Sequence, residues 1–177
     1  MIFPLTDHER RVRCMMEGFG QTTPERPTLA TQAARESRVA LLLEEVLEFA
    51  EDAAVTVCVR HGDDWVYLHP QRAKISDAVV PDGAWALMET EGAVPNLVGM
   101  IDALGDISVV NTGSFVAFGV RMTPILECID ANNMLKIATG RLNTETGKFE
   151  KHPNHPKPAI AYELQMQAYD PSPIVTD

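Results

Sequence analysis

The feature that most constrains this chain is an uninterrupted stretch from Ala30 to about Ala54 that contains no glycine or proline. It is rich in Ala, Leu, Glu and Arg, which are strong helix formers. Its apolar side chains recur at spacings of three and four residues, so a helix places them on one face. They are Val39, Leu42, Val46, Phe49 and Ala53. The sequence therefore predicts a long amphipathic helix against which other elements pack.

Three other segments have helical composition and recognisable ends. They are residues 6–19, 96–118 and 124–137. We expect Thr28 to cap the long helix, and Asn96 and Thr123 to cap the last two. Gly119 follows the third segment and is expected to end it. Together these segments predict four helices.

The part of the chain between the two longest helices has a different character. Residues 55–59 and 65–68 are short β-prone runs on either side of a turn, which predicts a hairpin inside an insertion at about 55–95. Within it, residues 84–90 are a candidate for a short helix. The polar, proline-rich residues from Gly140 onward predict a tail on the surface.

The chain of 177 residues has the length of one domain. We therefore expect a single all-α domain over residues 1–177, a four-helix bundle with a β-containing insertion. The net charge of −10 argues against binding to a nucleic-acid backbone, and no apolar run is long enough to predict a membrane span. Three widely spaced cysteines favour a reducing cytoplasm over a disulfide framework.

Acidic side chains are concentrated in two of the predicted helices. Glu44, Glu45 and Glu48 lie three and four residues apart, and Asp102 and Asp106 lie four apart. Such spacings place carboxylates side by side, where like charges repel. An acidic strip is usually the solvated face of a helix. Two strips in strongly apolar helices instead indicate a site that needs a counter-charge, and hard carboxylate oxygens favour Mg²⁺ or Mn²⁺.

The same residues resemble the signature of the MazG-like family. Arg38-x-x-Leu-Leu-x-Glu44-Glu45-x-x-Glu48 is similar to the first half of its motif, and Asp102-Ala-Leu-Gly-Asp106 to the second. The family usually has Glu-x-x-Asp there, whereas Ala103 stands three residues before Asp106 in this chain. Shorter matches follow in the family's order, at Phe19-Gly20, Ala117-Phe118-Gly119, Asn133-Met134-x-Lys136 and Gly147-Lys148-x-x-Lys151.

The resemblance implies an all-α enzyme that hydrolyses nucleoside triphosphates to monophosphate and pyrophosphate. It also implies a homodimer or homotetramer, and two or three Mg²⁺ or Mn²⁺ ions per active site. Glu45, Glu48 and Asp106 are the implied metal ligands, and Asp102 is a further candidate. Either Glu44 or Glu45 is expected to accept the proton of the attacking water.

Eight residues are candidates for binding the substrate. They are Arg38, Asn111, Asn133, Lys136, Lys148, Lys151, Trp65 and Trp85. The lysines suit phosphate groups as point cations, although surface lysines serve solubility more often. The tryptophans suit stacking on a base, although packing in the core is their commoner role.

The family members most similar to this chain are phage enzymes that take dGTP and GTP to monophosphates, from which 2-aminoadenine for phage DNA is made. That origin would place the chain in the host cytoplasm. Two alternatives remain open at this point. One is a phosphoribosyl-ATP, dUTP or dCTP pyrophosphohydrolase of the same superfamily. The other is a non-catalytic helical adaptor with an acidic face, which would not need a metal.

Overall fold

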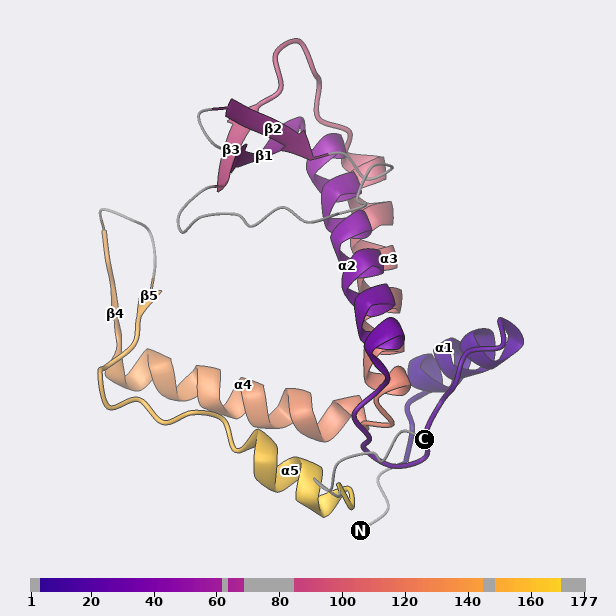
Figure 1. Ribbon diagram of the computed structural model, residues 1–177. Coiled ribbons are helices and arrows are strands. Elements are labelled where there is room, and N and C mark those ends of the chain that lie inside the picture. Colours follow the sequence, from indigo (N-terminus) through magenta and orange to yellow (C-terminus); the bar gives the residue numbers. More distant parts are fainter. Residues whose placement is uncertain (1–3, 62–63, 69–84, 145–148, 170–177) are drawn as a thin grey trace. The chain divides into compact units, whose positions relative to one another are not determined.

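The computed structural model describes residues 4–61, 64–68, 85–144 and 149–169 (Figure 1). The chain divides into two compact units, one made of residues 30–114 and the other of residues 1–29 with 115–177. Each unit is described by itself. A single domain over the whole chain stays a prediction.

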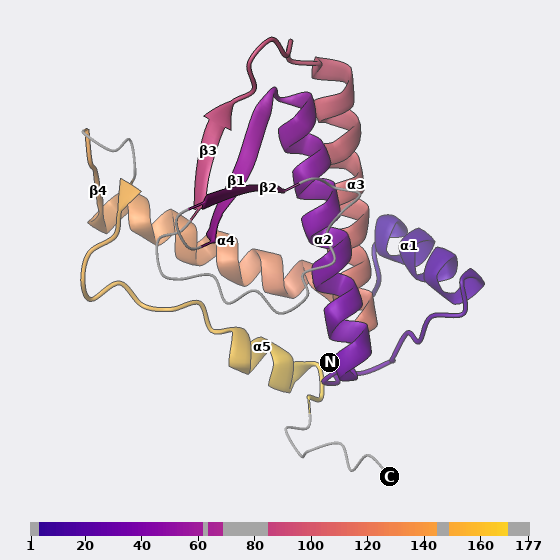
Figure 2. The ribbon, with the colours of Figure 1, turned by 45° about the horizontal axis from the view of Figure 1, so that its top comes forward.

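The unit of residues 30–114 contains two long helices and a small sheet. Helix α2 spans Gln32–Asp52 and helix α3 spans Leu97–Ala117, most of which belongs to this unit. The two helices lie side by side in both views (Figures 1 and 2). Between them in sequence, β1 (Val55–His61), β2 (Asp64–Leu68) and β3 (Trp85–Glu89) form an antiparallel sheet in the order β2-β1-β3.

The strands confirm the predicted hairpin and correct the expected helix at 84–90. β1 pairs with β2, as the two β-prone runs indicated. Residues 85–89 pair antiparallel with the other edge of β1, from Val59 opposite Trp85 to Val55 opposite Glu89. The pairing with β1 therefore outweighs the weak helical propensity of this segment and makes it a strand.

Asp52, at the end of α2, fixes the start of α3. Its backbone oxygen accepts a hydrogen bond of 2.7 Å from the Asn96 N–H. Its carboxylate accepts another of 3.0 Å from the Asn96 side chain. A Cβ at Gly99 would lie only 2.3 Å from the Asp52 carboxyl group. The missing side chain of Gly99 therefore permits the end of α2 to approach the start of α3 closely.

The second unit contains helices α1 (Asp7–Gly18), α4 (Met122–Thr139) and α5 (Ile160–Met166), and a hairpin of β4 (Arg141–Leu142) and β5 (Phe149–Glu150). Glu9 is 1% exposed. It accepts hydrogen bonds from the N–H groups of Thr6, at 2.7 Å, and Met122, at 2.9 Å. Burial opposes its ionisation, but these bonds and the charge of Arg121 outweigh burial and lower the pKa of Glu9.

The second unit also contains the turn between α3 and α4. Gly119 has a φ of +65°, in the left-handed region, and ends α3 as the sequence predicted. A Cβ at this position would lie 2.1 Å from the Arg26 carbonyl oxygen. Beside it, the Thr28 N–H donates to the Phe118 oxygen over 2.8 Å. The turn therefore needs a glycine both for its backbone conformation and for space.

Several predicted boundaries are wrong. Thr31, not Thr28, caps α2, because its hydroxyl accepts from the Ala34 N–H at 3.3 Å. Helix α4 begins at Met122 with Arg121 as its cap, which leaves Pro124 within the first turn, where a missing N–H removes no helical bond. The segment after Gly140 contains a hairpin and α5, so the described residues form five helices rather than four. The fold is nonetheless dominated by helices, as expected.

The helix faces are less covered than the apolar spacing suggested. Leu47 and Ala103 are buried, at 3% and 4% exposure. Val39 and Val46, on the predicted apolar face of α2, are 64% and 46% exposed. Further exposed apolar side chains lie on α3, namely Leu97, Val98, Ile101 and Leu104. All three cysteines are free. No single helix in the described ranges has the length and apolarity to cross a bilayer, although the bent pair α3 and α4 meets that test when taken together.

Candidate active site

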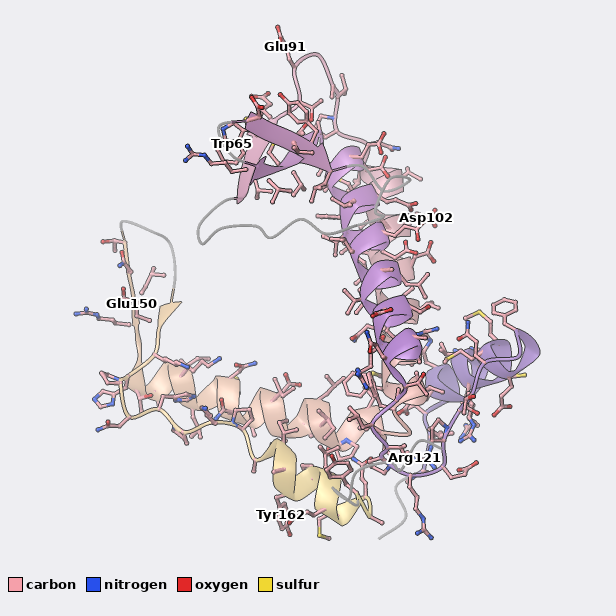
Figure 3. The ribbon with its side chains drawn as sticks, viewed as in Figure 1. Trp65, Glu91, Asp102, Arg121, Glu150 and Tyr162 are labelled. Atoms are coloured by element: carbon pink, nitrogen blue, oxygen red, sulfur yellow. The ribbon has the colours of Figure 1, made fainter. Side chains whose placement is uncertain are left out.

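The predicted acidic residues come from two neighbouring helices of one unit. Glu44, Glu45 and Glu48 lie on α2, and Asp102 and Asp106 lie on α3 (Asp102 is labelled in Figure 3). Glu44 and Glu45 are half-buried, and the other three are exposed. Helix α2 is regular throughout, so the carboxylates keep the side-by-side spacing that the sequence indicated.

Glu45 is the centre of this group electrostatically. Burial raises its pKa, and the charges of Glu48, Asp106, Glu44 and Asp102 raise it further. Its Oε2 atom is buried and has no hydrogen-bond partner among the described residues. A buried carboxylate oxygen of this kind is costly unless a cation or a donor meets it. The structure therefore brings the other four predicted acids within electrostatic range of Glu45.

Carboxylate oxygens are the ligands that Mg²⁺ and Mn²⁺ prefer. The unpartnered oxygen of Glu45 and its four acidic neighbours fit such an ion chemically. Over the described ranges, no three acidic, histidine or cysteine side chains are already gathered into a metal site. The individual ligands therefore stay predictions.

Arg38 lies on α2 seven residues before Glu45, close to two helical turns, and so on the same side of the helix. It is 9% exposed, and burial lowers the pKa of its guanidinium. Arginine is rarely buried, so the burial of Arg38 is unusual for a helix face that is only solvated.

The other predicted substrate residues are spread over both units. Asn111 is exposed on α3, in the unit that holds the acids. Asn133 and Lys136 lie one turn apart on α4 and are hydrogen-bonded to each other, and Lys151 is exposed after β5; these three belong to the other unit. Lys148 lies outside the described residues. Their roles toward a substrate stay predictions.

The two tryptophans belong to the sheet. Trp65 lies on β2 with 45% of its surface exposed (Figure 3), so it is not a fully packed core residue. Trp85 begins β3, opposite Val59 of β1. Stacking on a base stays a prediction for both.

Sequence reasoning missed a cavity of about 210 Å³ between the last turns of α2 and the inserted sheet. Its walls come from α2, from β1, from the end of β2 and from the loop after β3. They include Leu47, Ala50, Glu51, Val57, Leu68 and Thr90. The pairing of β1 with both β2 and β3 brings these segments together, so no local pattern in the sequence indicates the cavity.

Comparison with known proteins identifies the family. Residues 12–133 match the model of the family described as phosphoribosyl-ATP pyrophosphohydrolase, which lies in the MazG-like all-α superfamily. No curated protein matches the chain. The matched stretch contains α2, the insertion and α3, and so includes all five acids. Pyrophosphohydrolases of this family typically depend on a divalent metal. The chain therefore belongs to the phosphoribosyl-ATP pyrophosphohydrolase family and is a nucleotide pyrophosphohydrolase, a hydrolase that acts on phosphoanhydride bonds.

Proposed function

We propose that this chain hydrolyses dGTP and GTP to the monophosphate and pyrophosphate in a reaction that needs divalent cations. The observation that supports this most is the environment of Glu45. Four other carboxylates from two adjacent helices act on this half-buried acid, and its Oε2 atom has no hydrogen-bond partner in the part of the chain that the structure describes. A stable protein has little reason to keep such repulsion unless a cation relieves it.

The five acids have different proposed roles toward the metal ions. Glu45, Glu48 and Asp106 would hold two or three Mg²⁺ or Mn²⁺ ions, and Glu44 and Asp102 would complete or orient this set. Bound cations of this kind neutralise phosphate oxygens and lower the pKa of the attacking water. Their ligands are fixed by α2 and α3, which Asp52 and Asn96 join at one end.

The chemistry is attack of water at the α-phosphorus. Glu44 or Glu45 is proposed to accept the water proton. The oxygen of the water forms a bond to the α-phosphorus, and the bond from the α-phosphorus to the α–β bridging oxygen breaks. Pyrophosphate leaves with that oxygen. Lys136, Lys148 and Lys151 are proposed to neutralise phosphate charge.

The guanine preference comes from the resemblance to the phage enzyme MazZ. The dGMP formed would then supply the synthesis of 2-aminoadenine nucleotides. The family match itself favours a second candidate substrate, phosphoribosyl-ATP, which is cleaved at the same kind of phosphoanhydride bond.

A substrate panel separates these candidates. We would incubate the protein with dGTP, GTP, dATP, dCTP, dUTP and phosphoribosyl-ATP, each with Mg²⁺, and identify the products by anion-exchange chromatography. The proposal predicts the highest kcat/KM for dGTP and GTP. A preference for phosphoribosyl-ATP or for a pyrimidine nucleotide would contradict it.

We also propose that the active form is a homodimer or homotetramer. Large apolar side chains on both acidic helices are exposed in the single chain, among them Val39, Val46, Val98 and Ile101. Exposed apolar side chains that form one large patch usually mark an interface, and we propose that these side chains do so. Light scattering at micromolar concentration tests the proposal, and a monomer would contradict it.

A further inference from the structure

We propose that the cavity between α2 and the inserted sheet seats the guanine base, with Glu51 reading its Watson–Crick edge. This inference rests on the proposed function, because it names the part of the site that selects the nucleotide. It assigns a role to the insertion, whose strands supply much of the cavity wall.

The cavity and the acidic group lie on neighbouring sides of α2. Glu45 and Asp52 mark the side of α2 that faces α3, and Leu47 and Glu51 mark the side that faces the sheet. Successive helical residues are about 100° apart, so Glu48 lies midway around the helix between Glu45 and Glu51. Glu45 and Glu51 are about 9 Å apart along the axis. One extended nucleotide can therefore place its phosphates at the acidic group and its base in the cavity.

The walls of the cavity combine apolar surface with a carboxylate. Leu47, Val57 and Leu68 give apolar surface, which suits the faces of an aromatic base. Glu51 is the one ionisable side chain among the described lining residues. An ionised carboxylate accepts two hydrogen bonds side by side. Guanine offers two adjacent donors, at N1 and N2, whereas adenine places an unprotonated N1 there, so the carboxylate would favour guanine.

A pair of hydroxyl groups supplies the complementary donor. Thr56 and Thr90 both line the cavity, and their Oγ atoms are 2.6 Å apart. One of the two hydroxyl protons makes this bond, which leaves the other for a further acceptor. The guanine O6 is such an acceptor. Among the described lining residues, neither Trp65 nor Asn111 occurs, so the proposed reading residues differ from those that the sequence suggested.

The test compares dGTP with dITP, which lacks the N2 amino group. Replacing Glu51 by Gln removes the charge and one of the two acceptors. The kcat/KM for dGTP should fall by roughly 10- to 100-fold, as expected for a lost hydrogen bond to a charged group. The kcat/KM for dITP should fall much less, so the preference for dGTP should shrink. Glu36→Gln is the matched control, since Glu36 lies on the same helix, is exposed and accepts a hydrogen bond from Gln32 outside the cavity.

A binding measurement separates this inference from the proposed activity. Deoxyguanosine has no phosphate, so its binding can be followed by saturation-transfer NMR without metal. The wild-type chain and Glu45→Gln should bind it alike, and Glu51→Gln should bind it more weakly. If Glu51→Gln bound deoxyguanosine and discriminated dGTP from dITP as Glu36→Gln does, the proposal that the cavity binds guanine would be contradicted. The proposed hydrolysis of dGTP and GTP would not be affected by that result. A wild-type chain that binds deoxyguanosine but hydrolyses no nucleotide would contradict the proposed function alone.

Discussion

Replacing Glu45 by Gln should make the metal-free protein more stable. Like charges at helical spacing destabilise by about 0.2–0.5 kcal/mol per pair, and four carboxylates act on Glu45. Solvent screens the exposed partners, so we expect a net gain on the order of 1 kcal/mol. For a chain of this size that gain raises the midpoint of thermal unfolding by about 2–4 °C.

Adding Mg²⁺ should reverse this order. An ion at one hundred times its dissociation constant stabilises a folded protein by about 2.7 kcal/mol. The wild-type midpoint should therefore rise by about 5–10 °C. Glu45→Gln should lose most of that rise, together with 10²-fold or more of the turnover, on the order expected for a lost metal ligand.

Differential scanning calorimetry with EDTA and with Mg²⁺ measures both effects. Glu36→Gln serves as the control, because it removes one carboxylate from the same helix outside the acidic group. Unfolding of Glu45→Gln at or below the wild-type temperature in EDTA would contradict repulsion at Glu45. A full rise in the midpoint of this variant with Mg²⁺ would contradict its role as a metal ligand.

Three further predictions concern stability. Gly119→Ala should lower the free energy of unfolding in urea by about 1–3 kcal/mol, because its Cβ meets the Arg26 carbonyl oxygen at a positive φ. Glu9→Gln should cost about 1–3 kcal/mol at neutral pH. Because the folded-state pKa of Glu9 lies below its ordinary value of 4.5, this stabilisation is present above pH 4.5 and is lost as the pH falls through the folded-state pKa, so urea titrations of the variant and the wild type should converge at low pH. Asp52→Ala should cost about 1 kcal/mol in the same urea assay, through the lost bond to Asn96 and the lost negative charge at the start of α3; an unchanged midpoint would show that Asp52 does not fix α3.

The sequence predicted the features that local pattern determines. Helical spacing gave the long helices and the side-by-side acids, because both depend on residues within one turn of each other. The two β-prone runs gave the hairpin for the same reason. The family resemblance, now supported by the match over residues 12–133, came from short motifs on those helices.

The features that the sequence did not predict depend on contacts between distant residues. Trp85–Glu89 is a strand because the free edge of β1 pairs with it. Thr31 rather than Thr28 caps α2, and nothing in the local residue types separates two threonines three positions apart. Val39 and Val46 are exposed despite their helical spacing, because periodicity shows that residues share a face and not what covers it. The cavity beside Glu51 was missed because its walls come from separate segments.

The most direct test of the central claim is hydrolysis of dGTP in ¹⁸O-labelled water with Mg²⁺, with the products resolved by mass spectrometry. We expect equal amounts of dGMP and pyrophosphate, with the label in dGMP, because water attacks the α-phosphorus. We also expect no products in EDTA, and at least a 10²-fold lower rate for Glu45→Gln. Label in pyrophosphate, release of dGDP and phosphate, or full activity in EDTA would contradict the assignment of the acids on α2 and α3 as a metal-dependent pyrophosphohydrolase site.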